Sequence, residues 1–145
     1  WLGVGRVMMS NLLSRLWSIF LRKSEDSTNW MTIEDREDLR HLLEASHSKP
    51  QLIFKHSPRC SISSLARKEV QGLQQMIEAG ELDLDVHMVD VVNARNASNI
   101  VRETFDVRHE SPQYLLIYKG DVINHGSHMG VRSRDIITAV EQQLN

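Results

Sequence analysis

Cysteine is almost absent from this chain of 145 residues, which contains Cys60 and no other. A single cysteine excludes an internal disulfide bond and a zinc site built from several cysteines. It also fits a reducing compartment, where disulfides are rare. A lone cysteine is either a small buried apolar residue or a reactive thiol, and its neighbours in the sequence decide between the two.

Long apolar runs and a strong net charge are also missing. No run reaches the roughly 18–20 apolar residues that a membrane-spanning helix needs. The apolar stretch Leu16–Leu21 contains Ser18, and no small-residue cleavage site of a secretory signal follows it. The formal net charge of −2 provides no overall field for nucleic acid. We therefore expect a cytoplasmic protein with no nucleic-acid partner.

The N-terminal part differs from the rest in charge and pattern. Residues 1–23 contain basic but no acidic side chains, and apolar residues recur among them at helical spacing. This pattern predicts a basic amphipathic helix. It packs on its own domain or on a partner, is a frayed end of the chain, or makes a weak contact with an anionic membrane surface through residues 10–23. Residues 24–29 are typical of a linker. We therefore divide the chain into an N-terminal extension, 1–29, and a compact domain, 30–145.

The compact domain begins with a predicted helix, for which Thr32 is the N-cap and Asp35 lies in the first turn. From Gln51 onward, strand-like and helix-like segments follow in the order βαβαββα. Strands are predicted at 51–57, 84–92, 113–119 and from 122 onward, and helices from Cys60 to Gly80, over 93–106 and from Ser133, which can cap the last one.

The order of these segments constrains the sheet. Strands separated by helices run parallel through right-handed crossovers, whereas the last two, joined by a turn at Gly120-Asp121, form an antiparallel hairpin. The sequence therefore predicts an α/β protein with a mixed four-stranded sheet and helices on both faces. This is the core of the thioredoxin fold, here with an extra N-terminal helix.

Cys60 lies at the junction between the first predicted strand and the longest predicted helix. The first turn of a helix provides unpaired backbone N–H groups and about half a positive charge, and both favour the thiolate, which is the nucleophile. Arg59 and His56 can add positive potential. A structural cysteine would more naturally lie within the strand or on the apolar stripe of the helix, so this position favours a reactive role.

Ser63 stands where two-cysteine oxidoreductases have their second cysteine, in the motif Cys60-Ser61-Ile62-Ser63. A serine hydroxyl can donate a hydrogen bond to a thiolate, but it cannot form a disulfide. A disulfide formed at Cys60 must therefore be resolved by a thiol from another molecule.

Ser111-Pro112 precedes the third predicted strand. The bond before a proline is the kind of peptide bond for which the cis form costs little, and thioredoxin-like proteins place a cis-proline here, facing the active cysteine. We therefore predict a cis bond, with the backbone of Ser111 available to pair with a substrate strand.

Three segments carry a resemblance to a known family. They are IFKHSPRCSISS at 53–64, VRHESPQ at 107–113 and GSH at 126–128. Together they resemble the YtxJ-type monothiol bacilliredoxins, thioredoxin-fold proteins of the bacillithiol redox system, over roughly Trp30 to the C-terminus. Many relatives have a threonine near position 59 and a proline after the cysteine, whereas this chain has Pro58, Arg59 and Ser61.

The resemblance implies that Cys60 is the catalytic residue of a monothiol thiol–disulfide oxidoreductase. Cys60 would accept bacillithiol, or a similar low-molecular-weight thiol, from a bacillithiolated client protein, with bacillithiol as co-substrate and no bound cofactor or metal. The residues expected to support the thiolate are Arg59, Ser61, Ser63 and His56, and those expected to bind substrate are Ser111, Pro112, Gly126, Ser127, His128 and His109.

Two further functions remain open on the sequence. Monothiol glutaredoxins use a Cys-x-x-Ser motif with a small thiol to hold an iron–sulfur cluster between two subunits, so the chain could be a cluster carrier. It could also be a non-catalytic adaptor that keeps the fold and makes little use of its thiol. The pair His125 and His128 lacks other assigned ligands and is weak support for zinc.

Overall fold

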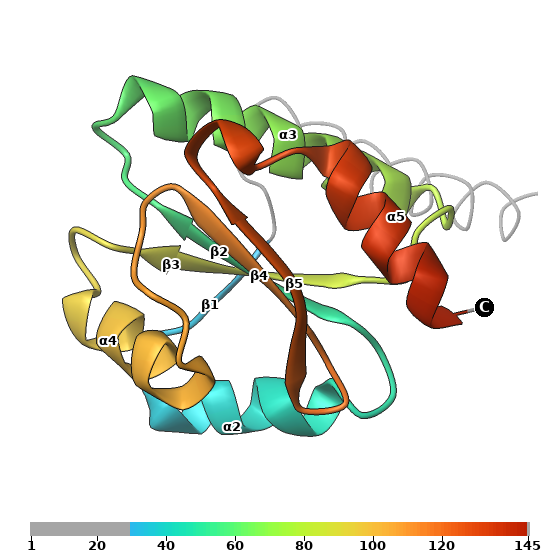
Figure 1. The fold of residues 1–145 in the computed structure, drawn as a ribbon, viewed down its shortest axis with the longest axis horizontal. Coiled ribbons are helices and arrows are strands. Elements are labelled where there is room, and N and C mark those ends of the chain that lie inside the picture. The colour runs from blue at the N-terminus through green and yellow to red at the C-terminus, as the bar shows by residue number, and fades with distance from the viewer. Residues whose placement is uncertain (1–29, 145) are drawn as a thin grey trace, which may run out of the picture.

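The computed structural model describes residues 30–144, which form one sheet between two pairs of helices (Figure 1). The predicted amphipathic helix, with its membrane contact through residues 10–23, lies outside the described residues, and so does the linker. In chain order the elements are β1 (Met31–Thr32), α2 (Arg36–Ala45), β2 (Gln51–His56), α3 (Ser61–Glu78), β3 (Asp85–Asp90), α4 (Arg95–Phe105), β4 (Gln113–Tyr118), β5 (Asp121–Ser127), the 3-10 helix η1 (His128–Gly130) and α5 (Ser133–Leu144).

The sheet has the strand order β1-β3-β2-β4-β5. Strand β3 is parallel to β1 and β2, whereas β4 is antiparallel to both β2 and β5. The predicted mixed α/β arrangement of the thioredoxin fold is therefore confirmed. Within residues 30–144, no helix is both long and apolar enough to cross a membrane.

The sheet has five strands rather than the predicted four, because Met31 and Thr32 pair with His87 and Met88 of β3. Thr32 is therefore not the N-cap of the first described helix. Asp35 takes that place, and its carboxylate accepts a hydrogen bond of 2.9 Å from the backbone N–H of Asp38. A strand of two residues is too short to leave an alternating pattern, and an aspartate caps a helix at least as well as a threonine.

Both faces of the sheet are covered, as Figure 1 shows for α3 and α5 on one side and α2 and α4 on the other. Every residue of β2 is buried, and successive side chains point to opposite faces. Leu52 and Phe54 belong to the core beneath α3 and α5, whereas Ile53 belongs to the core beneath α2 and α4. Strand β2 is therefore a central strand of the sheet. The segment that follows its C-terminal end leads to the start of α3.

The hairpin between β4 and β5 turns at Lys119 and Gly120, one residue earlier than predicted. Both residues have positive φ, 52° and 81°, as a tight two-residue hairpin turn requires. Ser46, after α2, fixes this turn because its carbonyl accepts from the Lys119 N–H at 2.8 Å and its hydroxyl from the Gly120 N–H at 3.1 Å.

Helix α5 begins at Ser133, but this serine does not cap it as predicted. Its N–H and its hydroxyl donate to the same carboxylate oxygen of Glu69, at 2.9 and 2.7 Å. Glu69 belongs to α3, so one side chain ties the start of α5 to the middle of the helix that follows Cys60.

Candidate active site around Cys60

Cys60 is the N-cap of α3 and is half-buried. A turn over Ser57, Pro58 and Arg59 joins it to β2, and the Cys60 N–H donates to the Ser57 carbonyl at 3.3 Å. Pro58 suits the second position of such a turn because its φ is already restricted to the required value. The thiol therefore sits at the junction of strand and helix, as the sequence predicted.

The pKa of Cys60 lies below the ordinary value of a cysteine thiol. The largest cause is the backbone N–H of Ser63, followed by the N–H of Ile62, and the Ser63 hydroxyl adds a smaller contribution. Partial burial opposes these effects and raises the pKa. The first turn of α3 therefore stabilises the thiolate directly, through hydrogen-bond donors.

Ser63 is fully buried one turn after Cys60. Its oxygen accepts a hydrogen bond of 3.4 Å from the backbone N–H of Ser57, while its hydroxyl contributes to the lowered pKa of Cys60. The side chain thus connects the end of the strand, the start of the helix and the sulfur.

Arg59 and His56 are not among the groups that lower the pKa of Cys60. Arg59 is exposed on the turn. His56 is buried and stacked on Phe54, with ring centroids 5.6 Å apart. Burial, and then the charge of Arg67, lower the pKa of His56, so the imidazole is neutral near pH 7 and adds no charge. Ser61 is the exposed first residue of α3.

The Ser111–Pro112 peptide bond is cis, as its place before the third predicted strand suggested. Pro112 is buried immediately before β4, whose next residue, Gln113, pairs with Lys55 of β2. Antiparallel pairing therefore places Pro112 at the edge of the sheet where β2 ends and the turn to Cys60 begins. The side-chain oxygen of Ser111 is buried and has no hydrogen-bond partner among the described residues.

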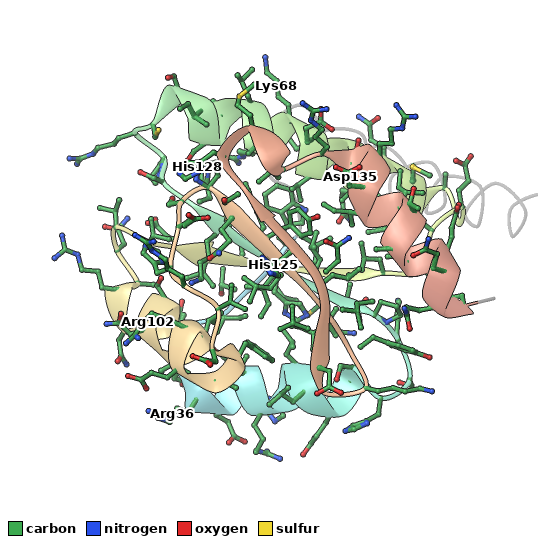
Figure 2. The ribbon with its side chains drawn as sticks, in the orientation of Figure 1. Arg36, Lys68, Arg102, His125, His128 and Asp135 are labelled. Carbon is green, nitrogen blue, oxygen red and sulfur yellow. The ribbon has the colours of Figure 1, made fainter. Side chains whose placement is uncertain are left out.

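Residues 126–128, at the end of β5 and the start of η1, lie next to Pro112 at the same end of the sheet. The backbone N–H of His128 donates to the Pro112 carbonyl at 2.9 Å. Gly126 has no room for a side chain, because a Cβ there would lie 2.7 Å from the Tyr114 ring and 2.9 Å from the Gly130 carbonyl oxygen. Figure 2 shows His128 on the side where α3 begins and His125 further back along β5.

Glu110 was missed by the sequence analysis, although it lies within the segment 107–113. A hydrogen bond with the Ser127 side chain is the main reason why the pKa of Glu110 lies below its usual range, and His128 contributes a smaller effect. This contact joins the loop before the cis-proline to the end of β5.

His109, which the sequence assigned to substrate binding, is exposed, and its contacts within the protein are made by Nδ1. Its Nδ1 lies 3.3 Å from the Nζ of Lys55 and 3.1 Å from the hydroxyl oxygen of Ser98 on α4. That nitrogen is therefore engaged within the protein. Lys55 was also missed, because a lone lysine in an apolar strand carries no sign of its partner, 54 residues away.

Groups of three or more histidine, cysteine, aspartate and glutamate side chains that could hold a metal ion do not occur among residues 30–144. What the described geometry brings together is one thiol with a lowered pKa, the donors of a helix N-terminus and a loop with a cis-proline. This arrangement suits nucleophilic attack on a disulfide.

Comparison with known proteins places these features in a family. Residues 31–136 match the family model described as monothiol bacilliredoxin BrxC. Among solved structures, the chain is similar to a candidate oxidoreductase with a thioredoxin fold, at 20% identity and a TM-score of 0.64 over 75% of this chain and 91% of that one. It is also similar to Fasciola hepatica thioredoxin, at 16% identity and a TM-score of 0.58 over 77% and 97%, and to thioredoxin from Trypanosoma brucei brucei, at 10% and 0.61 over 79% and 90%.

Proposed function

The chain belongs to the monothiol bacilliredoxin family, and from this premise we propose that it is a thiol–disulfide oxidoreductase that removes bacillithiol, or a similar small thiol, from protein mixed disulfides. The observation that carries the proposal is the setting of Cys60. Its sulfur is partly accessible, its pKa is lowered by two backbone N–H groups and a hydroxyl, and no second cysteine exists in the chain.

The proposed reaction is two successive thiol–disulfide exchanges. The Cys60 thiolate attacks the bacillithiol sulfur of the mixed disulfide, the bond between that sulfur and the client breaks, and the client leaves as a thiolate that takes a proton from water. A second small thiol, as thiolate, then attacks the adduct and forms a small-molecule disulfide, while Cys60 leaves as thiolate. No electrons are gained or lost by the protein over the cycle.

The surrounding residues have distinct roles in this proposal. Ser63 and the first turn of α3 stabilise the Cys60 thiolate, both as nucleophile and as leaving group. The backbone of Ser111, before Pro112, pairs with the client segment. Gly126 and Ser127 shape the adjacent edge, and His128 can contact a carboxylate of the small thiol. Bacillithiolated proteins are the proposed partners, in the cytoplasm.

Intact-mass measurement tests the reaction. Oxidised bacillithiol, or a bacillithiolated client, should add to the protein the mass of one bacillithiol less two hydrogens, and a reductant should remove it. Cys60→Ser should form no adduct and release no bacillithiol. Ser64→Ala, a change at an exposed position of α3, should still form the adduct and release bacillithiol.

Two results would count against the proposal in different ways. Release of bacillithiol by Cys60→Ser at the wild-type rate would refute the mechanism. Much faster adduct formation with oxidised glutathione than with oxidised bacillithiol would leave the mechanism intact and refute the substrate.

A further inference from the structure

Lys55 is a buried cation that the proposed chemistry does not use. Its side chain, near the end of β2, is fully buried, and burial followed by the charge of Arg102 lowers its pKa to about 8. Among residues 30–144 it has no ion-pair partner, and its hydrogen-bond contact is with Nδ1 of His109 at 3.3 Å. Burying an ammonium group without a carboxylate is costly, so a role for this lysine has to be sought in the contact it makes.

That contact fixes the ring of His109. An ammonium group has donors and no acceptor, so Nζ donates and Nδ1 accepts. The ring proton of a neutral His109 is therefore on Nε2, and the Ser98 hydroxyl approaches the same Nδ1 at 3.1 Å. Burial, then the charges of Lys55 and Arg102, lower the pKa of His109, in agreement with a neutral ring.

The segment 107–112, which we call the cis-proline loop, is held at a second point by Gln113. The Gln113 side chain donates to the Arg108 carbonyl at 2.9 Å and accepts from the Glu110 N–H at 3.4 Å. Gln113 is the residue that pairs with Lys55 across the strands. Lys55 on β2 therefore holds the loop at His109, and Gln113 on β4 holds it at the residues on either side of His109.

We propose that Lys55 is a positioning residue for client recognition, which acts by holding His109 and thereby the cis-proline loop beside Cys60. The inference rests on the proposed function, because it concerns the edge where the client segment would pair. It assigns Lys55 to binding rather than to activation of the thiol. Lys55 follows Ile53 on the face that α2 and α4 cover, where Figure 2 also shows Arg102 on α4, and it is not among the groups that shift the pKa of Cys60.

The test is Lys55→Met, which keeps the length of the side chain and removes the donor and the charge. Stability should be unchanged or higher, because an apolar group replaces a buried cation. For a synthetic peptide whose one cysteine is disulfide-linked to bacillithiol, KM should rise about fivefold, the factor that one ordinary hydrogen bond is worth, and kcat should stay within about twofold. Hydrogen exchange in the cis-proline loop should accelerate by a similar factor, and the reaction of Cys60 with dithionitrobenzoate should not change. A general structural defect would instead lower stability and affect all of these together.

Two further variants sharpen the test. Lys49→Met removes a lysine that is partly exposed and paired with Asp83 and Asp85, and it should leave KM and loop exchange unchanged. His109→Ala, which also removes the Ser98 contact, should raise KM at least as much as Lys55→Met does. The double variant should show no increase beyond that of His109→Ala, because both changes break the contact between Lys55 and His109. Additive effects would show that His109 touches the substrate independently of Lys55 and would overturn the inference.

Hydrogen exchange does not depend on the substrate. If the wild-type protein fails to act on the bacillithiol peptide, the proposed function fails, while accelerated exchange in Lys55→Met still supports the positioning role. Unchanged exchange in the loop refutes that role whatever the substrate, and slower reaction with dithionitrobenzoate refutes it by showing that Lys55 acts on the thiol.

Discussion

At the scale of single residues, the pKa of Cys60 depends in part on the side chain one turn later. Ser63 contributes to the lowered pKa of the thiol and also accepts from the Ser57 N–H. Ser63→Ala should therefore raise the pKa of Cys60 and slow exchange by no more than about tenfold, because the two backbone donors remain. The ultraviolet absorbance of the thiolate, followed against pH, measures the first effect.

Ser64→Ala is the matched control for this prediction. Its hydroxyl is exposed and donates to the Cys60 carbonyl at 3.4 Å, so its removal should leave the thiol pKa unchanged. Complete loss of exchange in a folded Ser63→Ala protein would contradict a supporting role and would point to a direct one.

Gly126 and Gly72 differ in the space available for a side-chain methyl group. At Gly126 a Cβ would lie within 3 Å of the Tyr114 ring and the Gly130 carbonyl, whereas at Gly72, within α3, nothing lies within 4 Å. Gly126→Ala should reduce the free energy of unfolding by about 1–3 kcal/mol, and Gly72→Ala should increase it by about 0.5–1 kcal/mol. Urea unfolding of both variants measures these changes, and a stabilised Gly126→Ala would contradict close packing of Gly126 against Tyr114 and Gly130.

At the scale of elements, the link between α3 and α5 depends on Glu69. Its carboxylate takes the place of an N-cap by accepting from the N–H and hydroxyl of Ser133. Glu69→Gln should cost about 1 kcal/mol of stability and increase hydrogen exchange in the first turn of α5, whereas Glu141→Gln, an exposed change on α5, should do neither.

The pH dependence of this link follows from the same bonds. The Ser133 N–H, followed by the Ser133 hydroxyl, lowers the pKa of Glu69 below its ordinary value of 4.5. The unfolded chain therefore takes up a proton first as the pH falls, so the contribution of Glu69 is present above about pH 4.5 and is lost at lower pH. An equal loss of stability in Glu69→Gln above and far below this pH would contradict the role.

Elements with a strong pattern were predictable from the sequence, and elements defined by distant partners were not. The long apolar stripe of α3 and the order of strands and helices identified the fold and the place of Cys60. The place of Ser111-Pro112 before the third predicted strand of that fold identified the cis bond. Strand β1 was not predicted, because its two residues form a strand only through pairing with β3. The contacts of Lys55 and Glu110 could not be predicted for the same reason, because their partners, His109 and Ser127, lie on other segments of the chain.

At the scale of the whole molecule, two buried histidines make stability depend on pH. Burial is the main cause that lowers the pKa of His56 and His87 below the ordinary value of 6.5. Between about pH 7.5 and 5.5 the unfolded chain binds protons at these positions while the folded protein resists them, so the free energy of unfolding should fall, by about 1–2 kcal/mol.

Urea midpoints at several pH values test this prediction. The carboxylates with shifted pKa values titrate below this pH range, because the pKa of each is lowered from an ordinary value of 4.5 or less. The change in stability between pH 7.5 and 5.5 therefore reports the histidines. Constant or increasing stability on acidification through this range would show that the folded protein accepts protons at these histidines without cost.

Ser63 also determines how the protein as a whole depends on its surroundings. A cysteine at that buried position could attack the disulfide at Cys60 within the same molecule, at an effective concentration set by the fold. Because Ser63 has a hydroxyl there, the proposed adduct can be resolved only by a thiol from another molecule, and its lifetime should be inversely proportional to the concentration of free thiol. In the proposed reaction, the fraction of molecules that carry the adduct therefore depends on the ratio of mixed disulfide to free thiol in the surroundings.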